Sequence, residues 1–192
     1  MTPTSINRPG IAPTPTRILI AGIGNMFLGD DGFGVAAAQR CAERPWPAGV
    51  QVRDFGLRCL DLAYALLEGW DAAILLDAVP RGQAPGTLYC IDLDPGDAPN
   101  SHAPAPDGHS IDLAHVRSLA LSLRPPGAAP LPRLLLVGCE PQRLEPEWEE
   151  GAEPLSPLVS AAVPAAVELV LGLVADLAAP SPTFPSSEAI TV

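Results

Sequence analysis

The segment RILIAGIGNMFLGDDGFGV, residues 17–35, determines how the rest of the chain is interpreted. It begins with an apolar run at 17–21 that ends at Gly22, which is typical of a strand buried on both faces of a sheet. A loop rich in glycine and aspartate follows, and Phe33 opens an amphipathic stretch that ends at Arg44, before a proline. A strand, a polar glycine loop and a helix in this order predict the first unit of an α/β fold.

The rest of the chain continues the alternation of strands and helices. Further strands are predicted at 50–55, 72–77, 86–92 and 133–137, and further helices at 60–67, 110–123 and within 155–179. This order predicts an α/β/α sandwich with a mostly parallel sheet of about five strands. We expect a single domain over residues 17–179. The Pro-rich segments 1–16 and 180–192 are expected to be disordered tails.

Charge and hydropathy narrow the classes of partner. The chain has 22 acidic residues against 11 basic ones, a formal net charge of -11. Such a protein is repelled by phosphate backbones and anionic lipid heads, so neither nucleic acid nor a membrane surface is an expected partner. The segment 155–179 is apolar and about long enough to span a bilayer. Because it carries Glu168 and Asp176, we expect a helix docked on the sheet instead.

The cysteines and the N-terminus bear on the cellular location. Cys41, Cys59, Cys90 and Cys139 have no CxxC spacing, so a tetrathiolate zinc site is not expected. Each lies in an apolar stretch, which predicts a reduced thiol in the core. The segment 1–16 has no apolar run of the kind found in secretory signals. Together these features predict a cytoplasmic protein.

Acidic side chains and a histidine follow several of the predicted strands. Asp30 and Asp31 come after the first strand, Asp77 ends the third, and His109 precedes the helix after the fourth. Ligands in α/β sheets bind at the carboxyl ends of the strands, so we expect these side chains to face one crevice. Carboxylate and imidazole together suit a divalent transition metal with open positions for water or substrate. The residues alone leave an alternative open, in which the aspartates cap a helix and His109 is an ordinary loop residue.

The glycine loop matches the dinucleotide-binding motif G-x-G-x-x-G only in part. Gly22 and Gly24 fit this motif, but Phe27 occupies the third glycine position. Asp30 and Asp31 would also face the pyrophosphate, and carboxylates oppose the binding of an anion. A nucleotide-binding domain is therefore an alternative that the loop does not favour.

The stretch 20–35 resembles the opening motif of the [NiFe]-hydrogenase maturation endopeptidases. Further matches follow in order: Asp54-Phe-Gly56, Leu75-Leu-Asp-Ala78, Pro85-Gly-Thr87, Asp107-Gly-His-Ser110, Val137-Gly-Cys-Glu-Pro141 and Leu155-Ser-Pro157. The similarity covers about residues 17–178. It implies an α/β/α sandwich and an endopeptidase that removes a C-terminal extension from the hydrogenase large-subunit precursor after nickel insertion.

The same resemblance implies roles for individual residues. Asp31, Asp77 and His109 correspond to the metal-contacting positions of the family, and the two aspartates to its catalytic carboxylates. The first position is commonly Glu in the family, so Asp31 reaches about one methylene less far. Gly24 and Asn25 are expected to position the substrate, with Asn25 or the amides of its loop stabilising the tetrahedral intermediate.

Nickel is expected to arrive with the substrate and to act as a recognition element, and another divalent metal could bind the isolated protein. Water activation is left open between a carboxylate base and the metal as Lewis acid. The expected partner is the large-subunit precursor, and the protein is expected to act as a monomer. A non-catalytic assembly chaperone that checks for nickel is the main alternative, because the same side chains would serve it.

Overall fold

The computed structural model describes residues 15–93, 113–144 and 155–179 of the 192-residue chain. Its elements in chain order are β1 (Ile18–Ile23), the 3-10 helix η1 (Gly29–Gly32), α1 (Phe33–Ala42), β2 (Val50–Gly56), α2 (Cys59–Ala65), β3 (Ala72–Ala78), β4 (Leu88–Asp92), α3 (Leu113–Leu123), β5 (Arg133–Cys139) and α4 (Pro157–Ala178). The predicted order of strands and helices is therefore confirmed. The expected tails lie outside the described residues, apart from Pro15 and Thr16.

The five strands form one sheet in the order β2-β1-β3-β5-β4. Every pairing is parallel except that of β4, which runs antiparallel to β5 at one edge. This confirms the prediction of a mostly parallel sheet of about five strands. β1 lies between β2 and β3, and all six of its residues are buried. The apolar run that opens the motif thus forms an interior strand covered on both faces.

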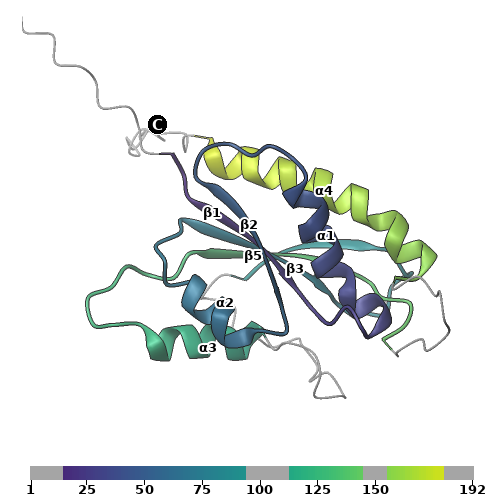
Figure 1. Cartoon of the computed structure of the whole chain (residues 1–192), viewed down its shortest axis with the longest axis horizontal. Coiled ribbons are helices and arrows are strands. Elements are labelled where there is room, and N and C mark those ends of the chain that lie inside the picture. The colour runs from purple at the N-terminus through teal and green to yellow at the C-terminus, as the bar shows by residue number, and fades with distance from the viewer. Residues whose placement is uncertain (1–14, 94–112, 145–154, 180–192) are drawn as a thin grey trace, which may run out of the picture.

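Helices cover both faces of the sheet: α1 and α4 lie on one side, and α2 and α3 on the other (Figure 1). Alternate side chains of each strand point to opposite faces. In β1, Ile18 and Ile20 join the core beneath α1 and α4, whereas Leu19 and Ala21 join the core beneath α2 and α3. The α/β/α sandwich expected from the sequence is confirmed.

Gly34 sets how closely α1 approaches the sheet. A Cβ at this position would lie 2.0 Å from the carbonyl oxygen of Leu76 and 2.3 Å from that of Ile23. Only glycine lets the first turn of the helix rest directly on β1 and β3. Because η1 runs straight into α1, this contact also fixes the position of η1 over the carboxyl ends of the strands.

α4 is the one described helix that is long and apolar enough to cross a membrane by length and composition, with a hydropathy of 2.2 over its most apolar window. Its buried residues join the core shared with α1 and the sheet: Val159, Ala162, Ala166, Val167, Val170 and Val174. The helix therefore packs on the sheet as expected. Its outward Glu168 pairs with Arg44 at 2.7 Å, which ties it to the end of α1.

The four cysteines are free, but they do not share one environment. Cys41 and Cys139 are buried as predicted, and burial raises the pKa of their thiols to about 11 and about 12 respectively. Cys59 is partly buried. The prediction is wrong for Cys90, which is exposed. Its apolar neighbours belong to β4, an edge strand that is not buried on both faces, so an apolar stretch there does not place every side chain in the core.

Candidate active site

Strand order places the carboxyl ends of β1 and β3 at a point where the chain changes direction across the sheet. After β1 the chain moves to β2 on one side, and it then crosses back so that β3 pairs with the other side of β1. Such a switch point is where open α/β sheets bind ligands. Asp77 lies near the end of β3, and Asp31 lies in η1, which follows β1. The structure thus brings these two predicted site residues to one place.

Both carboxylates are nearly excluded from solvent, with Asp31 7% and Asp77 8% exposed. The backbone N–H of Asn25 donates to Oδ2 of Asp31 at 2.7 Å, and that of Ala78 donates to Oδ1 of Asp77 at 2.9 Å. The pKa of Asp77 lies well above its usual value, first because burial disfavours the ionised form and second because Asp31 is negatively charged. The hydrogen bond from Ala78 opposes this shift without cancelling it. Two buried carboxylates that repel each other favour a cation.

Gly24 makes the close approach of these residues possible. Its φ of +117° suits glycine, and a Cβ there would lie 1.9 Å from the carbonyl oxygen of Asp31. The same Cβ would be 3.6 Å from Oδ1 of Asp77, so the loop backbone lies against both candidate residues. Gly24 is therefore required by geometry at the site, whatever it contributes to substrate binding.

The amides of this loop are engaged within the protein. The N–H of Gly24 donates to the carbonyl of Gly56 at 3.1 Å, and the N–H of Asn25 donates to Asp31. The side-chain oxygen of Asn25 accepts from the N–H of Phe27 at 3.0 Å. Of the oxyanion donors considered from the sequence, these two backbone amides are therefore already bonded. The side-chain nitrogen of Asn25 therefore stays the candidate oxyanion donor of this loop.

Asp30, the neighbour of Asp31, has a different function in the fold. It is fully buried, and its Oδ2 accepts from the N–H groups of Gln142 at 2.8 Å and Arg143 at 2.9 Å. Its Oδ1 accepts from the N–H of Ser156 at 2.6 Å, next to the start of α4. The sequence left open a structural role for Asp30 or Asp31, and the hydrogen bonds of the fold give that role to Asp30. It joins three segments that are far apart in the sequence.

Glu140 is a buried carboxylate that the sequence reasoning did not single out. Its oxygens accept from the N–H groups of Arg81 and Gly82 at 2.8–3.0 Å, and from the hydroxyl of Tyr89. Burial alone would raise the pKa of Glu140, but the hydrogen bonds from Tyr89 and the backbone amides outweigh it, so the pKa is lowered. Glu140 thereby holds in place the segment that leaves the sheet after Asp77. The matching motif around Cys139 marked this position, but not its partners.

His109, the third predicted metal-contacting residue, lies outside the described residues. Within 15–93, 113–144 and 155–179 there is no group of three or more His, Cys, Asp or Glu side chains that could hold a metal. The described structure thus contains two of the three predicted donors.

Comparison with known proteins decides the family. The family model for hydrogenase maturation proteases matches residues 35–173. The chain belongs to this family. The match includes Asp77 and the position of His109, and it begins four residues after Asp31. The family resemblance inferred from the sequence motifs is confirmed. The enzyme class expected from it, a peptidase, is the class of this family.

Individual relatives agree with the family match. The chain is 33% identical to the hydrogenase 2 maturation protease of Escherichia coli over 157 residues, which are 81% of this chain and 88% of that protein. It is 38% identical to the hydrogenase expression/formation protein HupD of Rhodobacter capsulatus over 133 residues, 68% of this chain and 60% of that protein. The chain thus spans about three fifths of the length of that relative.

Solved structures of hydrogenase maturation proteases share the fold. The hydrogenase maturating endopeptidase HybD of Escherichia coli superposes with a TM-score of 0.65 at 30% identity, covering 84% of this chain and 93% of that one. A hydrogenase 2 maturation peptidase from a Thaumarchaeota archaeon gives a TM-score of 0.59 at 30% identity, covering 83% of this chain and 99% of that one. The sandwich and its sheet order therefore position Asp31 and Asp77 within a fold that these peptidases share.

Proposed function

We propose that this protein is the endopeptidase that removes the C-terminal extension of a [NiFe]-hydrogenase large-subunit precursor after nickel has been inserted. One observation carries the proposal: a hydrogenase maturation protease fold holds the buried pair Asp31 and Asp77 at the switch point of its sheet. We further propose that the reaction takes place in the cytoplasm and that the enzyme acts as a monomer. Its partner is the precursor itself.

In this proposal nickel belongs to the substrate, and the enzyme senses it. Asp31 and Asp77 suit a divalent cation, because burial and mutual repulsion make the ionised pair unfavourable when no positive charge is nearby. His109 would supply an imidazole donor. Contact between these residues and the nickel ion of the precursor would place the scissile peptide, so that cleavage depends on completed metal insertion.

The remaining steps of the reaction are assigned to residues of this chain. Asn25 and Ala78 donate the N–H groups that orient Asp31 and Asp77. One of these carboxylates takes the proton of the attacking water as general base. The bound ion supplies positive charge that polarises the reacting groups. The side-chain amide of Asn25 is assigned to the oxygen that becomes negative in the tetrahedral intermediate.

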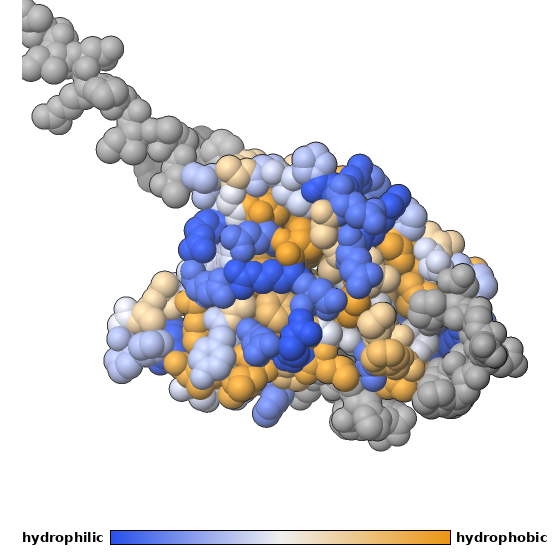
Figure 2. All heavy atoms as spheres, in the orientation of Figure 1, coloured by the Kyte–Doolittle hydropathy of each residue, from blue (hydrophilic) through white to orange (hydrophobic). Residues whose placement is uncertain are grey.

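A protein substrate also needs a surface beside the catalytic groups. The loop between β1 and η1 exposes two large apolar side chains, Met26 at 50% and Phe27 at 78%. Leu57 and Leu60 are also exposed, on the segment after β2, and the bond from Gly24 to Gly56 joins that segment to the loop. Apolar surface also extends along the layer of α2 and α3 (Figure 2). Exposed apolar groups next to a candidate site support the binding of a polypeptide.

The decisive experiment measures the intact mass of a nickel-loaded precursor before and after incubation with the enzyme. A nickel-free precursor and the Asp77→Asn variant are run in parallel. The proposal predicts loss of a C-terminal peptide only with nickel and only with the wild-type enzyme. A stable complex without any mass change would instead favour the assembly chaperone.

A second experiment tests the recognition step separately from cleavage. Calorimetry compares binding of nickel-loaded and nickel-free precursor to wild type, Asp31→Asn and His109→Ala. We expect both variants to lose the preference for the nickel-loaded form. Equal preference in all three proteins would show that these residues do not sense nickel.

A further inference from the structure

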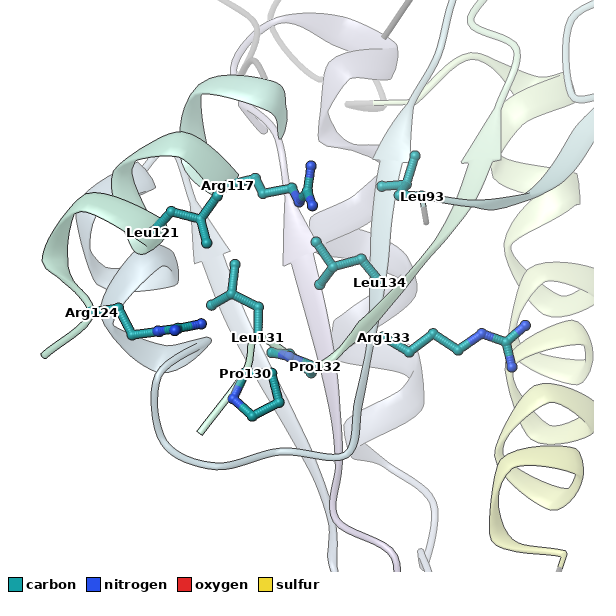
Figure 3. A pocket seen from close by; sticks show the side chains of 9 residues that line it. All are labelled: Leu93, Arg117, Leu121, Arg124, Pro130, Leu131, Pro132, Arg133 and Leu134. Atoms are coloured by element: carbon teal, nitrogen blue, oxygen red, sulfur yellow. The ribbon is translucent and has the colours of Figure 1, made fainter. Parts of the chain in front are cut away.

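A pocket of about 300 Å³ lies between α3 and the segment that leads into β5 (Figure 3). Its lining residues are Leu93, Arg117, Leu121, Arg124, Pro130, Leu131, Pro132, Arg133 and Leu134. The pocket is far from the candidate active site, because Arg133 and Leu134 begin β5, whereas Asp77 pairs with Gly138 near the end of that strand. It therefore has no part in the chemistry proposed above.

The lining combines an apolar surface with two arginines that lack acidic partners. Arg117 and Arg124 point into the pocket, while Arg133 turns away from it (Figure 3) and pairs with Asp92 at 2.5 Å. Within the part of the chain that the structure describes, Arg117 and Arg124 form no ion pair. None of the described lining residues is acidic, although acidic residues outnumber basic ones by 22 to 11 in the chain.

This arrangement favours an organic anion. Two guanidinium groups that line one pocket repel each other, and anionic groups bound there offset that repulsion. Arginine binds carboxylates through two parallel hydrogen bonds, a geometry that lysine does not provide. The leucines and prolines around Arg117 and Arg124 offer contacts to apolar groups. A ligand that satisfies both features carries carboxylates on an apolar backbone.

The spacing of the two arginines narrows the ligand further. Arg117 lies on α3 and Arg124 directly follows its last residue, Leu123, so the two are seven positions apart. Seven positions of helical rise correspond to about 10.5 Å. In a polyproline II segment the side chains of residues three apart lie on the same side, about 9 Å from each other. In a β-strand, residues three apart point to opposite faces instead.

We propose that this pocket binds an acidic peptide in polyproline II conformation, with two carboxylates three residues apart and apolar residues between them. Arg117 and Arg124 each hold one carboxylate, and the leucines and prolines of the pocket contact the residues between. The site is an exosite of the enzyme for an acidic polypeptide segment. Its existence does not depend on the peptidase reaction.

The test is calorimetry of the full-length protein with the blocked hexapeptide AEPPEA. The matched controls are AQPPQA, which lacks the charges, and AEPEPA, in which the carboxylates are two residues apart. We expect AEPPEA to bind more tightly than both, and its affinity to fall as salt is raised. Arg117→Gln and Arg124→Gln should each weaken it about tenfold. Arg40→Gln, which alters an exposed arginine on α1, should leave it unchanged.

Several results would overturn the proposal. One is equal affinity of wild type, Arg117→Gln and Arg124→Gln; another is no binding of AEPPEA at millimolar concentration. Inorganic phosphate that binds as tightly as the peptide would indicate a small-anion site instead. Arginine-dependent dimerisation in sedimentation experiments would assign the pocket to a second copy of the chain. Circular dichroism of both variants confirms that they are folded.

Discussion

The carboxylate of Asp30 accepts a hydrogen bond of 2.6 Å from the backbone N–H of Ser156, although 126 positions separate the two residues. The loop that carries Asp31 is thereby fastened to the start of α4. Two further N–H groups, of Gln142 and Arg143, complete the set of donors around Asp30. The position of the candidate catalytic Asp31 thus depends on a neighbour that is itself fully buried.

Asp30→Asn is therefore expected to lower stability. An asparagine places an amide where a carboxylate oxygen now accepts N–H groups, so at least one buried donor loses its partner. We expect a loss of about 3 kcal/mol in the free energy of unfolding, measured in urea at pH 7. Asp61→Asn is the matched control, because Asp61 is exposed and only pairs with Arg58 on the surface. Equal midpoints for both variants would contradict the structural role of Asp30.

Asp77→Asn is expected to raise the stability of the protein and to abolish cleavage. The native state must hold the Asp77 carboxyl in a buried site beside Asp31, which raises its pKa and costs stability at neutral pH. An asparagine carries no charge and still accepts the N–H of Ala78 through its side-chain oxygen. We expect a higher melting temperature than wild type at pH 7, together with no mass change of the nickel-loaded precursor. A lower melting temperature would mean that Asp77 contributes to stability in the free enzyme.

Glu140 provides a prediction about pH because the pKa of this carboxyl is lowered in the fold. A lowered pKa stabilises the native state at pH values above the usual pKa of glutamate, and this contribution disappears as the pH falls through the lowered value. We therefore expect Glu140→Gln to be less stable than wild type at pH 7, by about 2 kcal/mol. The difference should shrink steadily as the pH is lowered below about 4.5. Urea titrations from pH 7 to pH 3 measure it, and a difference independent of pH would contradict the assignment.

The fold, and the placement of Asp31 and Asp77 in one site, follow from local sequence patterns. The apolar run at 17–21 became β1, and the rule that ligands bind at the carboxyl ends of strands placed Asp31 and Asp77 together. Such patterns are local, because apolar periodicity and turn residues act within a few positions of the chain.

Features that depend on distant contacts could not be predicted in this way. Asp30 and Asp31 are adjacent, and their roles differ only because residues more than 110 positions away donate to Asp30. The partners of Glu140 come from the connection between β3 and β4 and from β4 itself. The exposure of Cys90 follows from the edge position of β4 in the sheet, which its own apolar neighbours do not reveal.

Phe27 allows a test of how the proposed substrate binds. Its ring is 78% exposed on the loop that holds Asp31, so replacing it removes apolar contact area without opening the core. We expect Phe27→Ser to raise KM for the nickel-loaded precursor about tenfold with kcat nearly unchanged. The reason is that the lost contact stabilises the bound substrate and the transition state equally. Tyr64→Ser is measured beside it, because this exposed aromatic residue lies on α2, four positions after Leu60, and an unchanged KM there would limit the binding surface to the loop. A fall in kcat alone would place Phe27 in the reaction itself, and equal kinetics of both variants with wild type would mean that the precursor binds elsewhere.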